Sequence, residues 1–291
     1  MFKCTLCPHR CGAVRDDVHG DGRCRMPALP RVARAAAHFG EEPCISGKNG
    51  SGTVFFSGCA LSCVFCQNHP ISHEDFGKTL TVDELADVFR RLVDSGVHNI
   101  NLVNPTHYIN AVRQALERYR PPIPVVYNSS GYERVESLKT LEGLVDVYLP
   151  DYKYADDTLA MTLSGAPAYR ETALSAIAEM LRQTGHLTLE NGLATRGTMV
   201  RHLVLPGYTK QSVAALTDLA DRFGKALWVS LMFQYTPVRP LPQKSLNRTL
   251  TARECQKLFD TLCDLGLENG YVQDVSGATA EYIPAFDLTG V

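Results

Sequence analysis

Three closely spaced cysteines after a short apolar stretch constrain this chain more than any other feature. Cys59, Cys63 and Cys66 have the spacing C-x3-C-x2-C within the sequence FFSGCALSCVFCQN. The apolar residues 53–57 predict a buried β-strand, so the cysteines are expected in the loop at its C-terminal end. Three thiolates are one fewer than a [4Fe–4S] cube takes for full cysteine ligation. The spacing therefore predicts an iron–sulfur cluster with one iron open for chemistry.

A structural zinc ion is the alternative occupant of this loop, because tetrahedral zinc takes four ligands. His69 follows Cys66 with the spacing C-x2-H and could supply the fourth ligand.

A second group of cysteines occupies the first 24 residues of the chain. Cys4, Cys7, Cys11 and Cys24 have the spacing C-x2-C-x3-C-x12-C. The segment has too few apolar residues to form a core of its own, so a bound metal is expected to stabilise it. Four thiolates suit either zinc or a fully ligated iron–sulfur cluster, and reduced thiols on a flexible arm are the alternative.

An isolated cysteine, Cys44, precedes a glycine-rich link. It is a candidate for a redox or hydrogen-donating thiol, although a lone cysteine is more often a small buried side chain.

Strand and helix patterns alternate from residue 53 onward. Six units in series predict a parallel sheet with right-handed crossovers, and six units are expected to form a partial (β/α)6 TIM-like open barrel. We therefore expect a Cys-rich extension over residues 1–52 and an α/β core over residues 53–291. In this core, residues 271–291 are expected to add a final strand and to cover the barrel. The predicted strands are 53–57, 98–103, 124–128, 145–149, 199–205 and 227–232, and the predicted helices are 81–95, 108–118, 133–142, 168–183, 210–223 and 251–265.

Polar residues follow or lie within several of the predicted strands. In barrels of this kind the active site lies at the C-terminal ends of the strands, where the cysteine loop is also expected. These side chains should therefore meet at one rim. The candidates are Asn104, Thr106, Asn128, Ser130, Asp151, Lys153 and Arg201.

Composition excludes several classes of protein. The formal net charge of −2 gives no broad basic surface for nucleic acid. No apolar run approaches the length of a membrane span, and the first residues lack the hydrophobic core of a signal peptide. We therefore expect a cytoplasmic protein whose ten cysteines serve as metal ligands more than as disulfides.

The cysteine loop resembles the signature of the radical S-adenosylmethionine (SAM) superfamily, and Phe65 before the last cysteine fits that signature. Further blocks are similar to the branch of pyruvate formate-lyase activating enzyme-like proteins that carries extra N-terminal cysteines. These blocks are EEPCISG, an NPTHY-like block, VVYNSSGYE, LPDYKY, VRHLVLPG and SLMFQYTP.

The resemblance implies a [4Fe–4S] cluster whose open iron binds the amino and carboxylate groups of SAM. Reductive cleavage of SAM then gives a 5′-deoxyadenosyl radical, which abstracts hydrogen from a substrate. The implied partners are SAM, an electron donor such as flavodoxin or ferredoxin, and a glycyl-radical enzyme as one candidate substrate. Another protein, a peptide or a small molecule is the alternative substrate, and an electron-transfer iron–sulfur protein is a more distant alternative.

Within that resemblance, each candidate at the rim has an expected role. Lys153 or Arg201 would pair with the methionine carboxylate, and Asp151 would orient the lysine or accept from a ribose hydroxyl. Asn128 and Ser130 would bind the ribose or carboxylate. Backbone carbonyls over 104–106 would accept from the ammonium, and Phe65 would lie against the adenine. The chain departs from the activating enzymes after the second strand, where Asn-Pro-Thr-His replaces a Gly-Gly-Glu type block, and before the first, where residues 48–53 replace an Asp-Gly-Pro-Gly-Ile-Arg type block.

Overall fold

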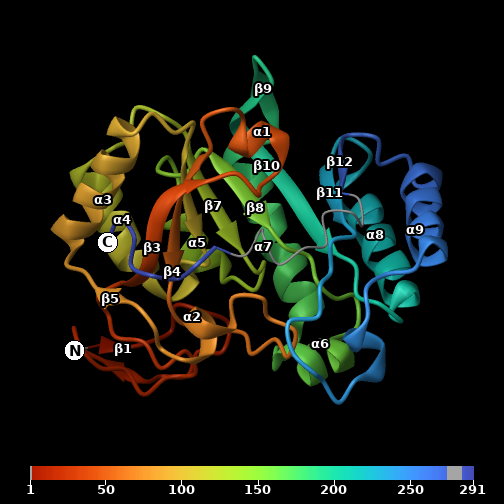
Figure 1. Cartoon of the computed structure of the whole chain (residues 1–291), viewed down its shortest axis with the longest axis horizontal. Helices are drawn as coiled ribbons and strands as arrows, with labels where there is room; N and C mark the ends of the chain where they lie inside the picture. The colour runs from red at the N-terminus through yellow and green to blue at the C-terminus, as the bar shows by residue number, and fades with distance from the viewer. Residues whose placement is uncertain (1, 274–283) are drawn as a thin grey trace.

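A mostly parallel β-sheet forms the centre of the protein, with helices packed outside it (Figure 1). The computed structural model describes residues 2–273 and 284–291. In this part of the chain the strand order is β12-β11-β10-β8-β7-β6-β4-β3-β5, a path with two ends. The sheet is therefore an unclosed, partial barrel, as the alternating pattern predicted.

Seven strands of the sheet run parallel to one another, and they include all six strands predicted from the sequence. Every residue of the first of them is buried, which is typical of a parallel strand covered on both faces. The seven are β4 (Ser51–Phe56), β6 (Ile100–Val103), β7 (Val125–Ser129), β8 (Val147–Pro150), β10 (Leu193–Leu203), β11 (Trp228–Met232) and β12 (Gly270–Gln273).

The remaining strands are antiparallel. β3 (Arg31–His38) pairs along the whole length of β4, so the sheet begins before residue 53. β5 (Lys78–Thr79) pairs with the start of β3, and β9 (Thr188–Glu190) forms a hairpin with the start of β10. A separate pair, β1 (Phe2–Lys3) and β2 (Val14–Arg15), lies among the N-terminal cysteines.

The predicted helices form on the outside of the sheet, each within a few residues of the expected bounds except for the shorter α5. They are α3 (Val82–Asp94), α4 (Ile109–Arg118), α5 (Val135–Lys139), α7 (Tyr169–Thr184), α8 (Thr209–Phe223) and α9 (Ala252–Asp264). Five short helices were not predicted: α1 (Pro43–Ser46), α2 (His69–His73), α6 (Asp157–Ser164) and the 3-10 turns η1 (Thr106–Tyr108) and η2 (Lys244–Asn247).

The two ends of the barrel differ in what covers them. The N-terminal segment, α2 and α6 lie at the lower end of Figure 1, and α1 and β9 lie at the upper end. β3 runs from the C-terminal end of β4 to its N-terminal end, so α1 follows at the N-terminal ends of the parallel strands. Cys44 and Ile45 of α1 pack there against Val126, Val147 and Met199. Helix α1 is therefore the floor of the barrel.

The C-terminal segment after β11 reaches both edges of the sheet. The predicted final strand is confirmed as β12, which pairs with β11 at one edge. Residues 284–291 lie against β3 near the other edge, where the Leu288 amide donates to the Ala33 carbonyl at 3.0 Å. The expected cover falls partly on residues 274–283, which lie outside the described residues. No helix in the described chain is long and apolar enough to cross a membrane.

Candidate active site

A cavity of about 300 Å³ lies at the C-terminal ends of the parallel strands. The cysteine loop forms one wall, and Cys59, Cys63 and Cys66 all border the cavity. Thr106, by contrast, lies outside the cavity and donates to the buried Glu133. Except for Thr106, the predicted cofactor-binding residues all border the cavity together with the cysteines. They are Phe65, Asn104, Asn128, Ser130, Asp151, Lys153 and Arg201.

The cysteine loop leaves β4 through a tight turn. Gly58 has φ +81°, and a Cβ there would lie 2.2 Å from Met26 Cγ, so only glycine fits. Just before it, the buried His107 donates from Nε2 to the Ser57 carbonyl at 2.8 Å. Burial lowers the pKa of His107 to about 3, so its ring is neutral and holds the end of the strand.

The end of α6 fixes the other side of the loop. Ser164 Oγ donates to Cys63 Sγ at 2.9 Å, and the Val64 amide donates to the Leu163 carbonyl at 2.9 Å. Ser72 of α2 approaches Cys66 Sγ with its hydroxyl at 3.3 Å. These contacts hold the loop with its sulfurs toward the cavity.

The three thiols affect one another electrostatically. Burial, together with the charges of Cys63 and Cys66, raises the pKa of Cys59 to about 12. Burial likewise raises the pKa of Cys63 to about 11, against the opposing charge of Lys153. Three sulfurs that interact in this way, next to a buried cation, suit a metal centre, because coordination deprotonates a thiol outright.

Lys153 and Asp151 form an ion pair at the end of β8. Burial alone would lower the pKa of Lys153, but Asp151 and the cysteine thiolates raise it, so the ammonium stays charged. The preceding turn approaches closely, since a Cβ on Gly131 (φ +72°) would lie 2.0 Å from the Asp151 carbonyl oxygen. The pair therefore faces the cavity from a rigid, crowded strand end.

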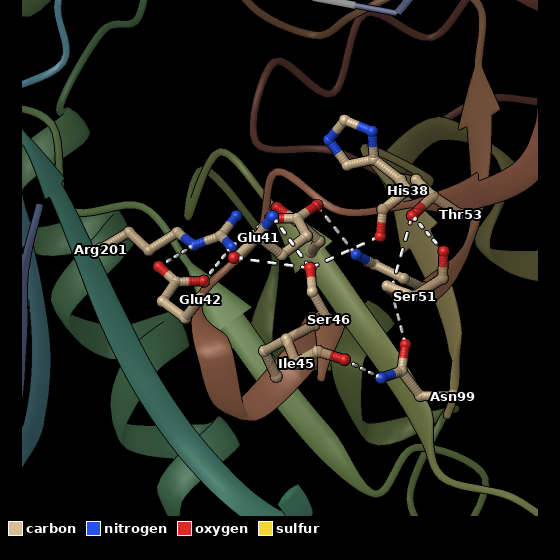
Figure 2. A network of polar contacts seen from close by, with 11 residues as sticks. His38, Glu41, Glu42, Ile45, Ser46, Ser51, Thr53, Asn99 and Arg201 are labelled. Atoms are coloured by element: carbon tan, nitrogen blue, oxygen red, sulfur yellow. Dashed lines mark hydrogen bonds and ion pairs between the residues drawn. The ribbon is translucent and has the colours of Figure 1, made fainter. Parts of the chain in front are cut away.

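A second charged group forms the bottom of the cavity, just above α1 (Figure 2). Arg201 of β10 donates from Nε to Glu42 Oε1 at 2.9 Å, and its Nη2 pairs with both Glu41 and Glu42. Burial alone would raise the pKa of Glu42, but the Arg201 guanidinium holds it below its usual range. Asn101 donates to Glu41 Oε1 at 3.0 Å, and Asn128 does so at 3.4 Å. Two carboxylates thus share one guanidinium at a site that is almost inaccessible to solvent.

Helix α1 is anchored below this group by a chain of hydrogen bonds, also drawn in Figure 2. Ser51 Oγ donates to Asn99 Oδ1 at 2.6 Å, and Asn99 Nδ2 donates to the Ile45 carbonyl at 2.7 Å. The Glu41 amide donates to Ser46 Oγ at 3.1 Å. These bonds fix the position from which both glutamates enter the barrel.

Two residues of the candidate site were not predicted from the sequence. Glu41 lines the cavity from a segment that was expected to lie outside the barrel, and its signals were the two adjacent acidic residues before Pro43 and the EEPCISG block that they begin. Ser164 donates a hydrogen bond to Cys63, from which it is separated by 101 positions in the sequence, so no local pattern indicates this contact. Cys44 does not border the cavity, because it is buried in the floor cluster of α1.

The zinc alternative for the loop gains no support from His69. Its Nδ1 lies 3.1 Å from Glu74 Oε1, and its ring stacks on His73 with the centroids 4.5 Å apart.

The N-terminal cysteines pack against the barrel beside η1. Cys4 and Cys7 are buried, Cys24 is partly buried and Cys11 is exposed. The buried Arg15 approaches Cys4 Sγ at 3.5 Å and donates to the His107 carbonyl at 2.7 Å. Across residues 2–273 and 284–291, no three Cys, His, Asp or Glu side chains are arranged to hold a single metal ion. The metal of the N-terminal group stays a prediction.

Comparison with known proteins extends the sequence signature to most of the chain. The sequence model of the Radical SAM superfamily matches residues 53–220, more than half of the chain. An uncharacterized protein of Methanocaldococcus jannaschii is 30% identical over 271 residues, which cover 89% of this chain and 74% of that protein.

Solved structures share the fold at low sequence identity. Streptococcus suis SuiB bound to S-adenosylmethionine has a TM-score of 0.53 and 11% identity, over 77% of this chain and 50% of SuiB. SuiB bound to its precursor peptide SuiA has a TM-score of 0.51 and 12% identity, over 75% of this chain and 46% of SuiB. The chain therefore spans about half the length of SuiB.

The family implies a [4Fe–4S] cluster and SAM as cofactors, and the cavity suits both groups. Three cysteine sulfurs border it on one side, and charged and polar side chains border it on the others. The family match, the cysteine loop and the partial barrel together show that this chain belongs to the radical SAM superfamily.

Proposed function

We propose that the protein is an enzyme that cleaves SAM reductively and abstracts a hydrogen atom from a substrate. The observation that carries this proposal is the single cavity that joins the three cysteines to a buried cation and to polar groups from the other strands. Its volume of about 300 Å³ is at the lower end of the range for small-molecule sites. A [4Fe–4S] cluster with SAM, when bound there, supplies the 5′-deoxyadenosyl radical.

The structure favours Lys153 over Arg201 as the partner of the methionine carboxylate. The charge of Lys153 opposes the effect of burial on the pKa of Cys63, and within the described residues this ammonium forms an ion pair with Asp151 alone. Arg201 instead holds Glu41 and Glu42 at the bottom of the cavity. We assign Lys153 to the carboxylate, and we assign Arg201 to the floor that supports the site.

Unpartnered polar atoms mark further contacts. Asn104 Oδ1, Ser130 Oγ and Gln234 Oε1 are buried without a hydrogen-bond partner in the described residues, and all three side chains border the cavity. Buried polar groups are usually satisfied, so these atoms suit the ammonium and the ribose hydroxyls of SAM or a polar substrate. Phe65 borders the same cavity and lies edge-on to Tyr235, which suits a contact with adenine.

As the hydrogen donor we propose the α-carbon of a glycine in a glycyl-radical enzyme. The sequence blocks that are similar to the pyruvate formate-lyase activating enzyme-like branch support this choice. The amide and hydroxyl groups at the cavity also match the hydrogen-bonding groups of a peptide backbone. Another protein, a peptide or a small molecule is the alternative donor.

An anaerobic assay of SAM cleavage tests the enzyme class. Reconstituted, reduced protein is expected to release 5′-deoxyadenosine from SAM, and Cys63→Ala should abolish that release. Cys255→Ala is the matched control, because Cys255 belongs to α9 and does not border the cavity, so the variant should keep full activity. Absence of 5′-deoxyadenosine from protein with an intact cluster would refute the proposal.

Electron paramagnetic resonance tests the hydrogen donor separately. With a glycyl-radical enzyme present, the proposal predicts a glycyl radical that forms only when SAM is added. Cleavage of SAM without a glycyl radical on any such partner would leave the enzyme class intact and refute the proposed substrate.

A further inference from the structure

The cysteine loop has a second accessible face, on the outside of the barrel. A surface groove of about 240 Å³ lies there, lined by Arg23, Cys24, Arg25, Cys59 and His73 among others. Cys59, Leu61 and Ser72 border both this groove and the inner cavity. A molecule in the groove would therefore contact the back of the loop whose front faces the SAM cavity.

The rim of this groove carries arginines that no acidic side chain neutralises. Arg23 donates to Ser62 Oγ at 2.8 Å, and Arg25 donates to the His73 carbonyl at 2.9 Å. Close by, Arg239 donates to the Val64 carbonyl at 2.9 Å. Within the described chain none of the three forms an ion pair with a carboxylate. Their guanidinium groups are thus bonded only to neutral acceptors.

The acidic residues of the neighbouring helix α2 and its end are engaged elsewhere. Glu74 pairs with His69, and Asp75 pairs with Arg31. Burial, followed by the charges of neighbouring side chains that include Arg239 and Arg25, lowers the pKa of His73 against an opposing effect of Glu74, so two arginines act on this ring. The groove therefore presents a positive surface although the chain as a whole has a net charge of −2.

The two faces of the cysteine loop suit two different binding partners. SAM and the hydrogen donor need the inner cavity, so an electron delivered during turnover has to arrive from another side. The groove offers such a side, because Cys59 borders both the groove and the inner cavity. A positive groove attracts a negatively charged partner and increases its association rate.

We propose that this groove docks an acidic one-electron donor protein of the flavodoxin or ferredoxin class. The donor is oxidised by one electron, the cluster is reduced by the same electron, and no covalent bond forms or breaks in that step. The proposal rests on the cluster of the proposed function. It does not depend on the identity of the hydrogen donor, because its readout is reduction of the cluster in the absence of SAM.

Stopped-flow measurement of cluster bleaching by reduced bacterial flavodoxin tests the docking surface. The double variant Arg23→Glu/Arg25→Glu is expected to be reduced about 10-fold more slowly than the unmodified protein at low salt, and the difference should shrink as salt is added. Photoreduced deazaflavin, a small neutral reductant, should reduce both proteins at the same rate. Arg253→Glu is the matched control, because this exposed residue of α9 lies on another element.

Two outcomes would overturn the docking site. One is an equal flavodoxin rate in the double variant and in the Arg253→Glu control. The other is a flavodoxin rate of the unmodified protein that does not change with salt, which stays informative even if the double variant folds poorly. If SAM is not cleaved and yet the cluster is reduced as predicted, the proposed function fails and the docking site stands.

Discussion

Replacing Arg201 by methionine is expected to destabilise the protein strongly, because the change leaves Glu41 and Glu42 without their shared cation. Glu42 is fully buried, and the side chains of Arg201 and Glu41 are only 8% and 10% exposed. Removing one partner from a buried ion pair typically costs about 3–5 kcal/mol. With an m value of about 3 kcal/mol/M, the urea midpoint should fall by about 1–1.7 M.

The cost should depend on pH in a defined direction. In the unmodified protein Arg201 holds the pKa of Glu42 low, so the contribution of this carboxylate is present at neutral pH and is lost only as pH falls through that lowered value. In Arg201→Met, burial is no longer opposed, and the pKa of Glu42 rises. The penalty should therefore be largest at about pH 8 and should shrink toward about pH 5, as the carboxylate takes up a proton.

Urea unfolding under anaerobic conditions measures the effect. Arg222→Met is the matched control, because this arginine is 47% exposed, lies 3.3 Å from Glu171 and should cost less than about 1 kcal/mol. Adding Glu42→Gln to Arg201→Met should recover part of the loss. Equal midpoints for the Arg201 and Arg222 variants would refute the assignment of Arg201 to the floor and would favour a role in holding SAM.

Three further changes address the site directly. Lys153→Ala should weaken SAM binding to the reconstituted protein by about 10-fold to 100-fold in anaerobic calorimetry, given about 1.5–3 kcal/mol for a charged hydrogen bond, whereas the exposed Lys257→Ala should not. Cys63→Ser should lose the cluster, measured as iron content and visible absorbance, and Cys255→Ala should retain it. Ser164→Ala removes the hydroxyl that donates to Cys63 Sγ, so the cluster potential should fall by about 20–60 mV in a potentiometric titration. An unchanged potential would show that this hydrogen bond is absent when the cluster is bound.

The regular part of the fold was predictable because its signals are local. Each of the six core strands is a short apolar run between turn residues. Five of them formed within a few residues of their predicted bounds, whereas β10 begins at Leu193, six residues before its predicted start. The β9–β10 hairpin was missed although Asn191-Gly192 is a typical turn for it, with φ values of +52° and +80°. Helix α6 was missed although Asp156 caps its start and Gly165, with φ +60°, ends it. The turn and capping residues of these two elements are local signals, so both elements could have been predicted from the sequence.

The arrangement of the site was only partly predictable. The cysteine spacing and the polar strand ends indicated which residues meet at the rim, because parallel strands end at one edge. No local pattern showed that Glu41 contacts Arg201, because the two residues lie far apart in the sequence. They meet because β3 leads the chain to the N-terminal ends of the parallel strands, where Glu41 enters the barrel. The same holds for the approach of Arg23 and Cys24 to the back of the cysteine loop, which is a contact between distant segments.

The most direct test of the central claim is whether SAM binds the cluster held by Cys59, Cys63 and Cys66. Electron–nuclear double resonance of the reduced protein, with SAM isotopically labelled at its amino nitrogen and carboxylate, measures this contact. We predict hyperfine coupling from both labels to the cluster, with the carboxylate coupling lost or weakened in Lys153→Ala. An intact, reduced cluster that shows no coupling to labelled SAM would contradict the claim that this cavity is a radical SAM active site.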